Sequence, residues 1–188
     1  MARIDPLPED QWDESVAPIL GATPPGADQP LGRMNIFATL ARHAELFKAW
    51  MPFGGYLLTS GTLSGRDREL LILRTAINCG SPYEWGQHVR ISLAGGIDRE
   101  MIDRVPAGPD APGWSDSESA LLRAADELHS AAKISDATWA ALAESYDERQ
   151  LVEIAMLVGQ YHMVAFTLNS LEVEQDEGLE GLPGSNLP

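Results

Sequence analysis

Helix-start signals recur along this chain and constrain its fold more than any other feature. Five cap residues each precede a run of helix-forming residues, namely Ser64, Ser81, Asp98, Ser115 and Asp147. A cap side chain accepts a hydrogen bond from one of the first N–H groups of a helix, which have no partner inside the helix. Convincing runs of alternating apolar and polar residues with β-branched side chains, which would indicate strands, are not found. The sequence therefore predicts an all-α fold.

Three of these starts have the capping-box pattern, in which a glutamate or glutamine follows three residues after the cap. The pairs are Ser81 with Glu84, Ser115 with Glu118, and Asp147 with Gln150. Pro82 also suits the first position of a helix, where its missing N–H costs nothing. On this local reading, Glu84 only satisfies a backbone donor of its own helix.

The length of 188 residues suits one domain with a hydrophobic core. Residues 1–34 are rich in Pro, Gly and Asp and predict an extended segment with a short helical patch at 11–20. Residues 35–174 are expected to form the helical domain. Its first helix runs from 35 to about 58, with break points at Pro52 and Gly54-Gly55. Residues 175–188 are expected to form a solvated, flexible acidic tail.

The charge excludes two classes of partner. The formal net charge is -15, so a nucleic acid or an anionic membrane would repel the protein. Cys79 is the only cysteine, which excludes an intramolecular disulfide and a Cys-based metal cluster.

The most apolar stretch, residues 151–171, predicts a buried helix of a soluble protein. Four polar side chains interrupt it and would be costly in lipid, namely Glu153, Gln160, His162 and Asn169. The first 20 residues lack the apolar core of a signal peptide. We therefore expect no membrane contact and a cytoplasmic location.

Two charged residues lie in or beside the apolar run of residues 66–80. Glu69 and Arg74 are the exceptions in a segment whose leucines and isoleucines cover much of the predicted helix surface. A charge inside a buried helix is unfavourable unless it is paired or used. An internal salt bridge or a subunit-interface pair is the alternative to a functional role for Arg74.

Several motifs in this order resemble the carboxymuconolactone decarboxylase and alkylhydroperoxidase D-like family. The first part reads RDRELLILRTA and YEWGQHVRISLAGGIDREMIDRV, and the later part is similar to a decarboxylase-type branch from ADELHSAAKISDATW to GQYHMVAFTLN. The resemblance covers roughly residues 35–173. It implies an alkylhydroperoxidase D-like helical bundle that assembles as a homotrimer or homohexamer.

The peroxidase members of that family carry a glutamate, eleven residues, C-x-x-C, three residues and a histidine. On this pattern Glu69 matches the glutamate and His88 the histidine, while Ser81 and Glu84 replace the two cysteines. Peroxide reduction needs an attacking thiolate and a resolving thiol, which these two residues do not supply. Cys79 has no second cysteine and is expected to be buried and inert.

The residues that remain favour acid–base chemistry. The resemblance implies that Glu69, Glu84 and His88 form a carboxylate–histidine–carboxylate cluster, with His88 as proton donor. We expect a cofactor-independent decarboxylase that acts on a small unsaturated carboxylic acid or lactone from aromatic-compound breakdown. Arg74 is the expected anchor for the anionic substrate. One histidine and two carboxylates are also a ligand set for a divalent metal, but the resemblance favours a site without metal.

Four further side chains are candidates for substrate binding. Tyr83 and Trp85 flank the acid–base pair, although aromatic residues at a helix start are often simply packed. Gln160 and His162 are two residues apart and point to different sides of their helix, so at most one of them enters the site. A hydrogen-bonded core or interface histidine is the alternative for His162. His43 and His129 are expected at the surface or an interface.

Two other functions stay open. One is an alkylhydroperoxidase or peroxiredoxin-like antioxidant protein, by family name. The other is a non-catalytic ligand-binding member of the fold. The sequence fixes neither the substrate nor the choice between trimer and hexamer.

Overall fold

The computed structural model describes residues 1–24 and 29–184, and within these ranges it contains helices and no strand. The all-α prediction is therefore confirmed. Expectations for residues 25–28 of the N-terminal segment and 185–188 of the tail lie outside the described residues. The helices are α1 (Ala17–Leu20), α2 (Asn35–Leu40), α3 (Ala44–Thr59), α4 (Gly65–Asn78), α5 (Pro82–Ala94), α6 (Arg99–Arg104), α7 (Asp116–Ala131), α8 (Asp136–Ala143) and α9 (Glu148–Leu171). Short 3-10 turns are η1 (Glu9–Gln11), η2 (Leu31–Arg33), η3 (Ala41–His43) and η4 (Val105–Ala107).

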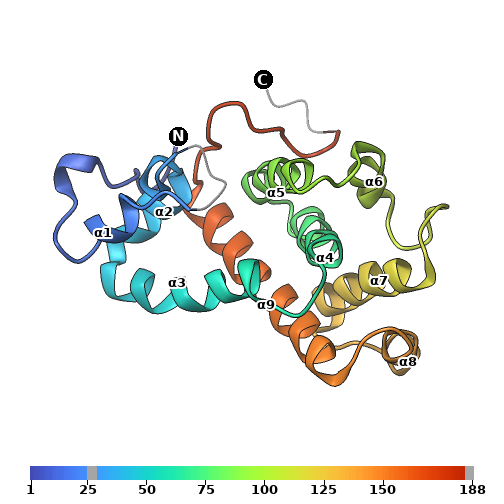
Figure 1. The fold of residues 1–188 in the computed structure, drawn as a ribbon. Coiled ribbons are helices and arrows are strands. Elements are labelled where there is room, and N and C mark those ends of the chain that lie inside the picture. The colour runs from blue at the N-terminus through green and yellow to red at the C-terminus, as the bar shows by residue number, and fades with distance from the viewer. Residues whose placement is uncertain (25–28, 185–188) are drawn as a thin grey trace.

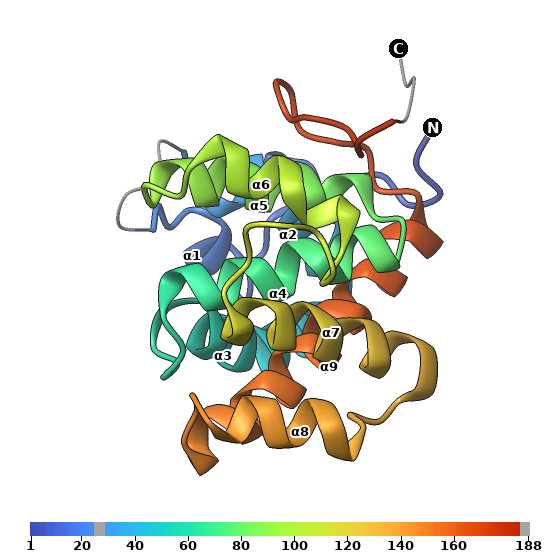
Figure 2. The same cartoon turned by 90° about the vertical axis from the view of Figure 1, so that its right-hand side faces the viewer.

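Helix α4 lies at the centre of the bundle. It packs against α7, α9 and α5, and Figure 2 shows it between α5 above and α7 below. Four consecutive side chains of α4, from Leu70 to Leu73, have no exposed area. Since successive helical residues point in different directions, α4 is covered on all sides. Helices α1, α2 and α3 lie on the side of the bundle opposite α6 and α7 (Figure 1).

Only some of the predicted cap residues accept a backbone hydrogen bond through their side chains. Ser64, Ser115 and Asp147 each accept a backbone N–H, and the last two form complete capping boxes. Ser81 precedes α5 and Asp98 precedes α6 (Arg99–Arg104), but neither side chain makes a cap bond. The hydroxyl of Ser81 and both carboxyl oxygens of Glu84 are buried without a hydrogen-bond partner. The capping box predicted for this pair is therefore wrong.

The segment from residue 35 to 58 bends earlier than the sequence indicates. It divides at η3, where His43 leaves helical geometry with φ -116° and ψ 76°. His43 then caps α3, because its Nδ1 accepts the backbone N–H of Leu46 at 3.4 Å. Pro52 lies inside α3, and the helix continues across it. A proline inside a helix removes one backbone hydrogen bond and crowds the carbonyl one turn earlier, but buried Phe47 and Leu57 pack α3 on either side of Pro52.

The acidic tail is tied to the domain over its described part, which differs from the expectation of a solvated segment. Two donors of α5 bond to Asp176 Oδ2: the Tyr83 hydroxyl at 2.7 Å and Gln87 Nε2 at 2.6 Å. The other oxygen, Oδ1, accepts the backbone N–H of Asn35 at 2.8 Å. These three donors therefore hold the carboxylate of Asp176 in the tail against α5 and the start of α2.

Helix α9 meets the length and composition of a membrane span, but its apolar residues pack inside the bundle. Of its most apolar window, 56% is buried, and the helix contacts α3, α4, α5, α7 and α8. It is a core helix, as the polar interruptions of residues 151–171 predict.

A carboxylate on α9 holds the loop between α3 and α4. Glu153 accepts hydrogen bonds from the backbone N–H of Thr62 at 2.6 Å, the Thr62 hydroxyl at 2.7 Å and the backbone N–H of Leu63 at 3.2 Å. Burial alone would raise the pKa of Glu153, but these bonds outweigh burial and lower it. The polar interruption at residue 153 therefore fixes the entry into α4.

We predict that Glu153→Gln lowers the free energy of unfolding by about 2–3 kcal/mol at neutral pH, because an amide nitrogen would face the loop donors. Urea unfolding followed by circular dichroism measures the change. Glu148→Gln, at an exposed position of the same helix, is the matched control and should change stability by less than about 0.5 kcal/mol. Equal effects of the two substitutions would contradict the role given to Glu153.

Candidate functional site

A buried ion pair joins α4 and α5. The Nδ1 atom of His88 lies 2.7 Å from Glu69 Oε2, and the side chains are 8% and 2% exposed. An ionised glutamate has no hydrogen to donate, so the Nδ1–H of His88 donates to Glu69, and Nε2 remains for another partner. The resemblance implied that Glu69 and His88 lie together, and in the structure they are hydrogen-bonded.

Arg68 adds a cation to this pair. Its Nε donates to Glu69 Oε1 at 3.0 Å, so Glu69 has a basic partner on each oxygen. The Arg68 side chain is 21% exposed, which brings one edge of the site to the surface. Sequence reasoning missed Arg68 because it lies beside Glu69 in a hydrophilic helix start, where arginines are commonplace.

Tyr161 of α9 closes the site from the other side. Its ring meets the His88 imidazole edge to face, with ring centroids 4.9 Å apart. Sequence reasoning weighed Gln160 and His162 but not the tyrosine between them. The three consecutive side chains point in different directions from α9, and only Tyr161 points toward His88.

Glu84 lies one helical turn before His88 and has no hydrogen-bond partner. It is 2% exposed, and both of its oxygens are buried. The hydroxyl of Ser81, one turn earlier, is likewise buried and unpartnered. The two positions that carry cysteine in the peroxidase pattern thus hold two polar side chains whose hydrogen-bonding capacity is unused within the described chain.

The two carboxyl groups have opposite protonation preferences. Burial would raise the pKa of Glu69, but the charge and hydrogen bond of His88, together with those of Arg68, lower it below the ordinary value. Burial raises the pKa of Glu84 well above its ordinary value. Glu69 is therefore ionised at neutral pH, whereas burial favours the neutral form of Glu84.

Arg74 is engaged elsewhere and does not join these residues. Its Nε and Nη2 donate to the two carboxylate oxygens of Asp126 at 2.6 and 2.9 Å. Its Nη1 donates to the carbonyl oxygens of Val105 and Pro106 at 3.1 and 3.2 Å. This is the internal salt bridge that the sequence left open, with all three guanidinium nitrogens occupied. The arrangement does not support the expectation that Arg74 anchors a substrate.

The aromatic candidates are packed side chains. Tyr83 is 2% exposed, and its hydroxyl joins Asp176 to the backbone N–H of Ile36. Trp85 is 1% exposed and belongs to the apolar cluster formed by α4, α5 and α6. Neither has a hydrogen bond or ring contact to His88 in the described structure.

Gln160 and His162 lie on different sides of α9, as expected. Gln160 is buried and its Oε1 has no partner. His162 lies with His129 and Cys79 in a group that the sequence did not indicate. Burial lowers the pKa of His162, so this ring is neutral at neutral pH. Neither residue is hydrogen-bonded to Glu69, Glu84 or His88.

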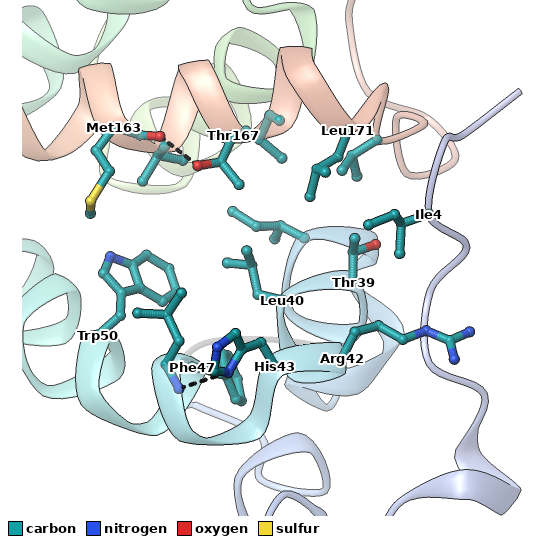
Figure 3. A pocket seen from close by; sticks show the side chains of 15 residues that line it. Ile4, Thr39, Leu40, Arg42, His43, Phe47, Trp50, Met163, Thr167 and Leu171 are labelled. Atoms are coloured by element: carbon teal, nitrogen blue, oxygen red, sulfur yellow. Dashed lines mark hydrogen bonds between the residues drawn. The ribbon is translucent and has the colours of Figure 1, made fainter.

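A cavity of about 260 Å³ lies between α2, α3 and α9, apart from the acid–base residues. Figure 3 shows Trp50 and Phe47 of α3 facing Met163 and Thr167 of α9 across it. Its lining is almost wholly apolar. Two buried polar atoms of its lining residues, Trp50 Nε1 and Thr39 Oγ1, have no partner.

Comparison with known proteins shows what part of the chain is similar to a family. Residues 44–127 match the model of the Carboxymuconolactone decarboxylase family, and this range includes Glu69, Glu84 and His88. No curated relative matches the sequence significantly.

Solved structures share the fold. A peroxidase-related protein with an alkylhydroperoxidase AhpD core from Ralstonia eutropha JMP134 is 20% identical, with a TM-score of 0.75 over 91% of this chain and 87% of that one. A peroxidase-related protein from Silicibacter sp. TM1040 is 17% identical, with a TM-score of 0.70 over 93% and 89%. The debrominase Bmp8, in complex with 2,3,4-tribromopyrrole, is 14% identical, with a TM-score of 0.74 over 93% and 91%.

At these identities the structural likeness establishes the fold alone. The matched family model covers the helices that carry the acid–base residues. Residues 44–127 are therefore similar to the carboxymuconolactone decarboxylase family, and the chain has the alkylhydroperoxidase D-like helical fold.

Proposed function

We propose that this protein is a cofactor-independent decarboxylase, located in the cytoplasm, that acts on a small unsaturated carboxylic acid or lactone from aromatic-compound breakdown. The observation that carries the proposal is the buried Glu69–His88 pair, with a 2.7 Å hydrogen bond that leaves Nε2 of His88 for the substrate. The family match is consistent with this class of reaction but does not specify it.

His88 supplies the proton in this mechanism. The bond between the substrate carbon and its carboxylate breaks, carbon dioxide leaves, and the electron pair moves into the conjugated system of the substrate. The Nε2–H of a charged His88 then protonates the carbon that has gained the electrons. Ionised Glu69 stabilises the charged imidazole and fixes which nitrogen faces the substrate.

Arg68 takes the role of substrate anchor that was expected for Arg74. An anionic substrate approaches a protein of net charge -15 and needs a local cation. Arg68 is partly exposed and is bonded to the same carboxylate as His88. It is therefore suited to hold the substrate carboxylate beside the proton donor.

Glu84 supports the proposal as a neutral group. A second buried carboxylate near His88 would repel the anionic substrate and the electron pair that stays on it when carbon dioxide leaves, whereas a protonated carboxyl is a hydrogen-bond donor without charge. Burial of Glu84 favours this neutral form.

The thiol chemistry of a peroxidase has little support in these residues. Burial raises the pKa of the Cys79 thiol to about 11, with a smaller contribution from Glu84. The attacking species in peroxide reduction is a thiolate, and the chain has no second cysteine to resolve the product.

We also propose that the protein assembles as a homotrimer or homohexamer through α3 and α9. Large apolar side chains on these two helices are exposed in the single chain. They are Leu46, Phe53, Tyr56, Val152, Met156, Met163 and Phe166. Exposed apolar side chains gathered on two helices favour contact with a second copy.

Carbon dioxide release from a panel of small unsaturated dicarboxylic acids and lactones tests the mechanism. We expect release by the metal-free wild type and a loss of at least about 100-fold in kcat for His88→Ala, because general-acid catalysis contributes this much or more. Glu69→Gln should reduce kcat in the same direction. His43→Asn, which keeps an acceptor for the α3 cap, is the histidine control.

Two results would contradict the proposal of a decarboxylase. One is the absence of release from every panel member while a panel acid binds wild type and Glu84→Gln equally, which would point to a ligand-binding protein. The other is thiol-dependent peroxide consumption by the wild type, which would favour the antioxidant function.

The protonation of Glu84 has its own test, through stability. The pKa is 4.5 in an unfolded chain and higher in the folded protein, so above this pH the folded state binds one more proton. Its stability then falls as pH rises, by up to about 1.4 kcal/mol per pH unit, until the folded pKa is passed. We predict that Glu84→Gln becomes increasingly more stable than wild type as pH rises.

Urea unfolding of wild type and Glu84→Gln between about pH 4 and about pH 8 measures this difference. The exposed substitution Glu148→Gln should give a difference that does not change with pH in the same way. A stability difference for Glu84→Gln that is constant over the whole range would show that Glu84 is ionised in the folded protein.

Light scattering coupled to size-exclusion chromatography tests the assembly. We expect three or six times the 20.4 kDa chain mass, and Phe166→Glu should lower the mass by placing a charge on the apolar surface. A wild-type mass of one chain would contradict the proposal.

A further inference from the structure

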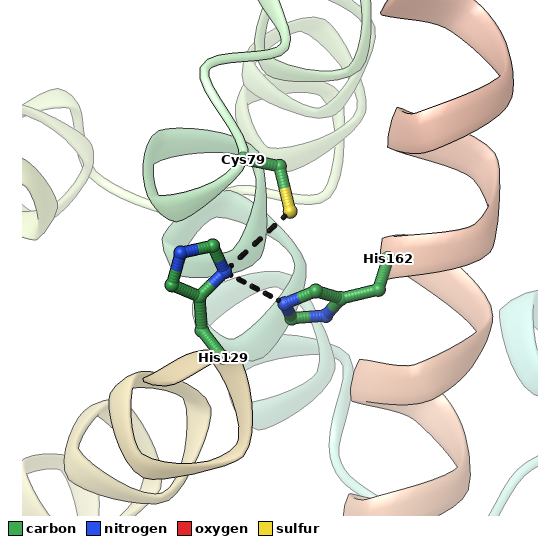
Figure 4. A group of neighbouring side chains, drawn as sticks. All are labelled: Cys79, His129 and His162. Carbon is green, nitrogen blue, oxygen red and sulfur yellow. Dashed lines mark hydrogen bonds between the residues drawn. The ribbon is translucent and has the colours of Figure 1, made fainter. Parts of the chain in front are cut away.

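Three side chains from three helices converge on one point outside the acid–base residues. Cys79 follows the last residue of α4, His129 lies in the last turn of α7, and His162 lies in the middle of α9. Figure 4 shows the thiol and the two imidazole rings pointing toward one another. Cys79 Sγ is 3.9 Å from His129 Nδ1, and His129 Nδ1 is 3.0 Å from His162 Nε2.

These separations are close to those of ligands on one tetrahedral ion. With zinc–sulfur and zinc–nitrogen bonds of about 2.3 and 2.0–2.1 Å, a sulfur and a nitrogen ligand lie ~3.6 Å apart and two nitrogens ~3.3 Å apart. The three ligand atoms all lie within 4.8 Å of one another. Small side-chain adjustments would therefore place all three at bonding distance from one ion.

The surroundings orient two of the three groups. His162 Nδ1 lies 2.8 Å from the carbonyl oxygen of Val158 and donates to it. This bond fixes the tautomer, so the Nε2 lone pair of His162 faces the other two side chains, as in metal-ligating histidines. The side-chain amide of Asn169, also on α9, donates to the carbonyl oxygen of Cys79 at 2.9 Å and holds the end of α4 beside α9.

We propose that Cys79, His129 and His162 bind a zinc ion through one thiolate and two imidazoles. The thiol proton leaves to solvent as the sulfur–zinc bond forms. Thiolate and imidazole are ligands that zinc prefers, and three protein ligands leave a fourth position for water. His129 is exposed, so this position faces the solvent.

The site joins parts of the fold that are distant in sequence. An ion there would link the ends of α4 and α7 to the middle of α9. It would raise the free energy of unfolding, and tighter binding would raise it more. It shares no residue with the Glu69–His88 pair. The metal proposal therefore stands or falls separately from the decarboxylase.

Without metal, the same geometry is a hydrogen-bonded histidine pair beside a thiol, in which His129 Nδ1–H donates to His162 Nε2. The two arrangements differ in what they predict for metal affinity. A histidine pair without a metal site gives no saturable binding that depends on Cys79.

Cobalt(II) is the probe, because a thiolate ligand gives it an intense sulfur-to-metal absorption band in the near ultraviolet. We expect chelator-treated wild type to develop this band to saturation at one ion per chain, and zinc to displace the cobalt. Cys79→Ser should lose the band. His129→Ala should weaken cobalt binding at least about tenfold, since even loss of a supporting contact to a ligand costs this much.

His43→Asn is the matched control, because His43 lies outside the group and lines the apolar cavity. It should bind cobalt like wild type, and all variants should give the wild-type circular dichroism spectrum. If His129→Ala does not fold, the comparison of wild type with Cys79→Ser decides. Absence of the band in wild type, or cobalt binding that is the same in Cys79→Ser and wild type, would overturn the proposal.

Discussion

The ion pair between Glu69 and His88 is the interaction on which the site depends. Helix α4 is covered on all sides, and a charge on it has to be compensated within the bundle. Glu69 meets this requirement with His88 from α5 on one oxygen and Arg68 on the other. The pair therefore fixes α5 against α4 and aims one nitrogen of His88 away from Glu69. The same hydrogen bond therefore compensates the buried charge of Glu69 and orients the imidazole of His88.

The contrast with Glu84 shows how partners decide the state of a buried group. Both glutamates are almost fully buried, but only Glu69 has basic partners. The pKa of Glu69 is lowered and that of Glu84 is raised. The pKa values of two chemically identical side chains on neighbouring helices are thereby shifted in opposite directions, which is a common arrangement where one group accepts and another donates protons.

Local sequence patterns predicted much of the fold, and the resemblance predicted the central pair of the site. The capping boxes of α7 and α9 and the buried character of α4 depend on neighbours within one helix, and such neighbours can be identified from spacing. The same pattern failed at Ser81, whose hydroxyl is buried instead of capping, because S-x-x-E does not say how its helix is packed.

Contacts between distant segments were out of reach of this reasoning. Spacing placed Arg74 in the apolar helix but could not show that it forms a salt bridge with Asp126 of α7. Tyr161 contacts His88, and His162 joins Cys79 and His129, because α9 passes both groups. A helical period gives the direction of a side chain but not what stands opposite it.

The docked tail has a consequence for how copies of this chain could meet. Gly86 of α5 has no room for a side chain, since a Cβ atom there would lie 2.6 Å from the carbonyl oxygen of Glu180 and 2.9 Å from Leu179 Cβ. The outer face of α5 is thus already occupied by the chain itself. The tail covers this face in cis, so the cover is present at a fixed one-to-one ratio and at any protein concentration.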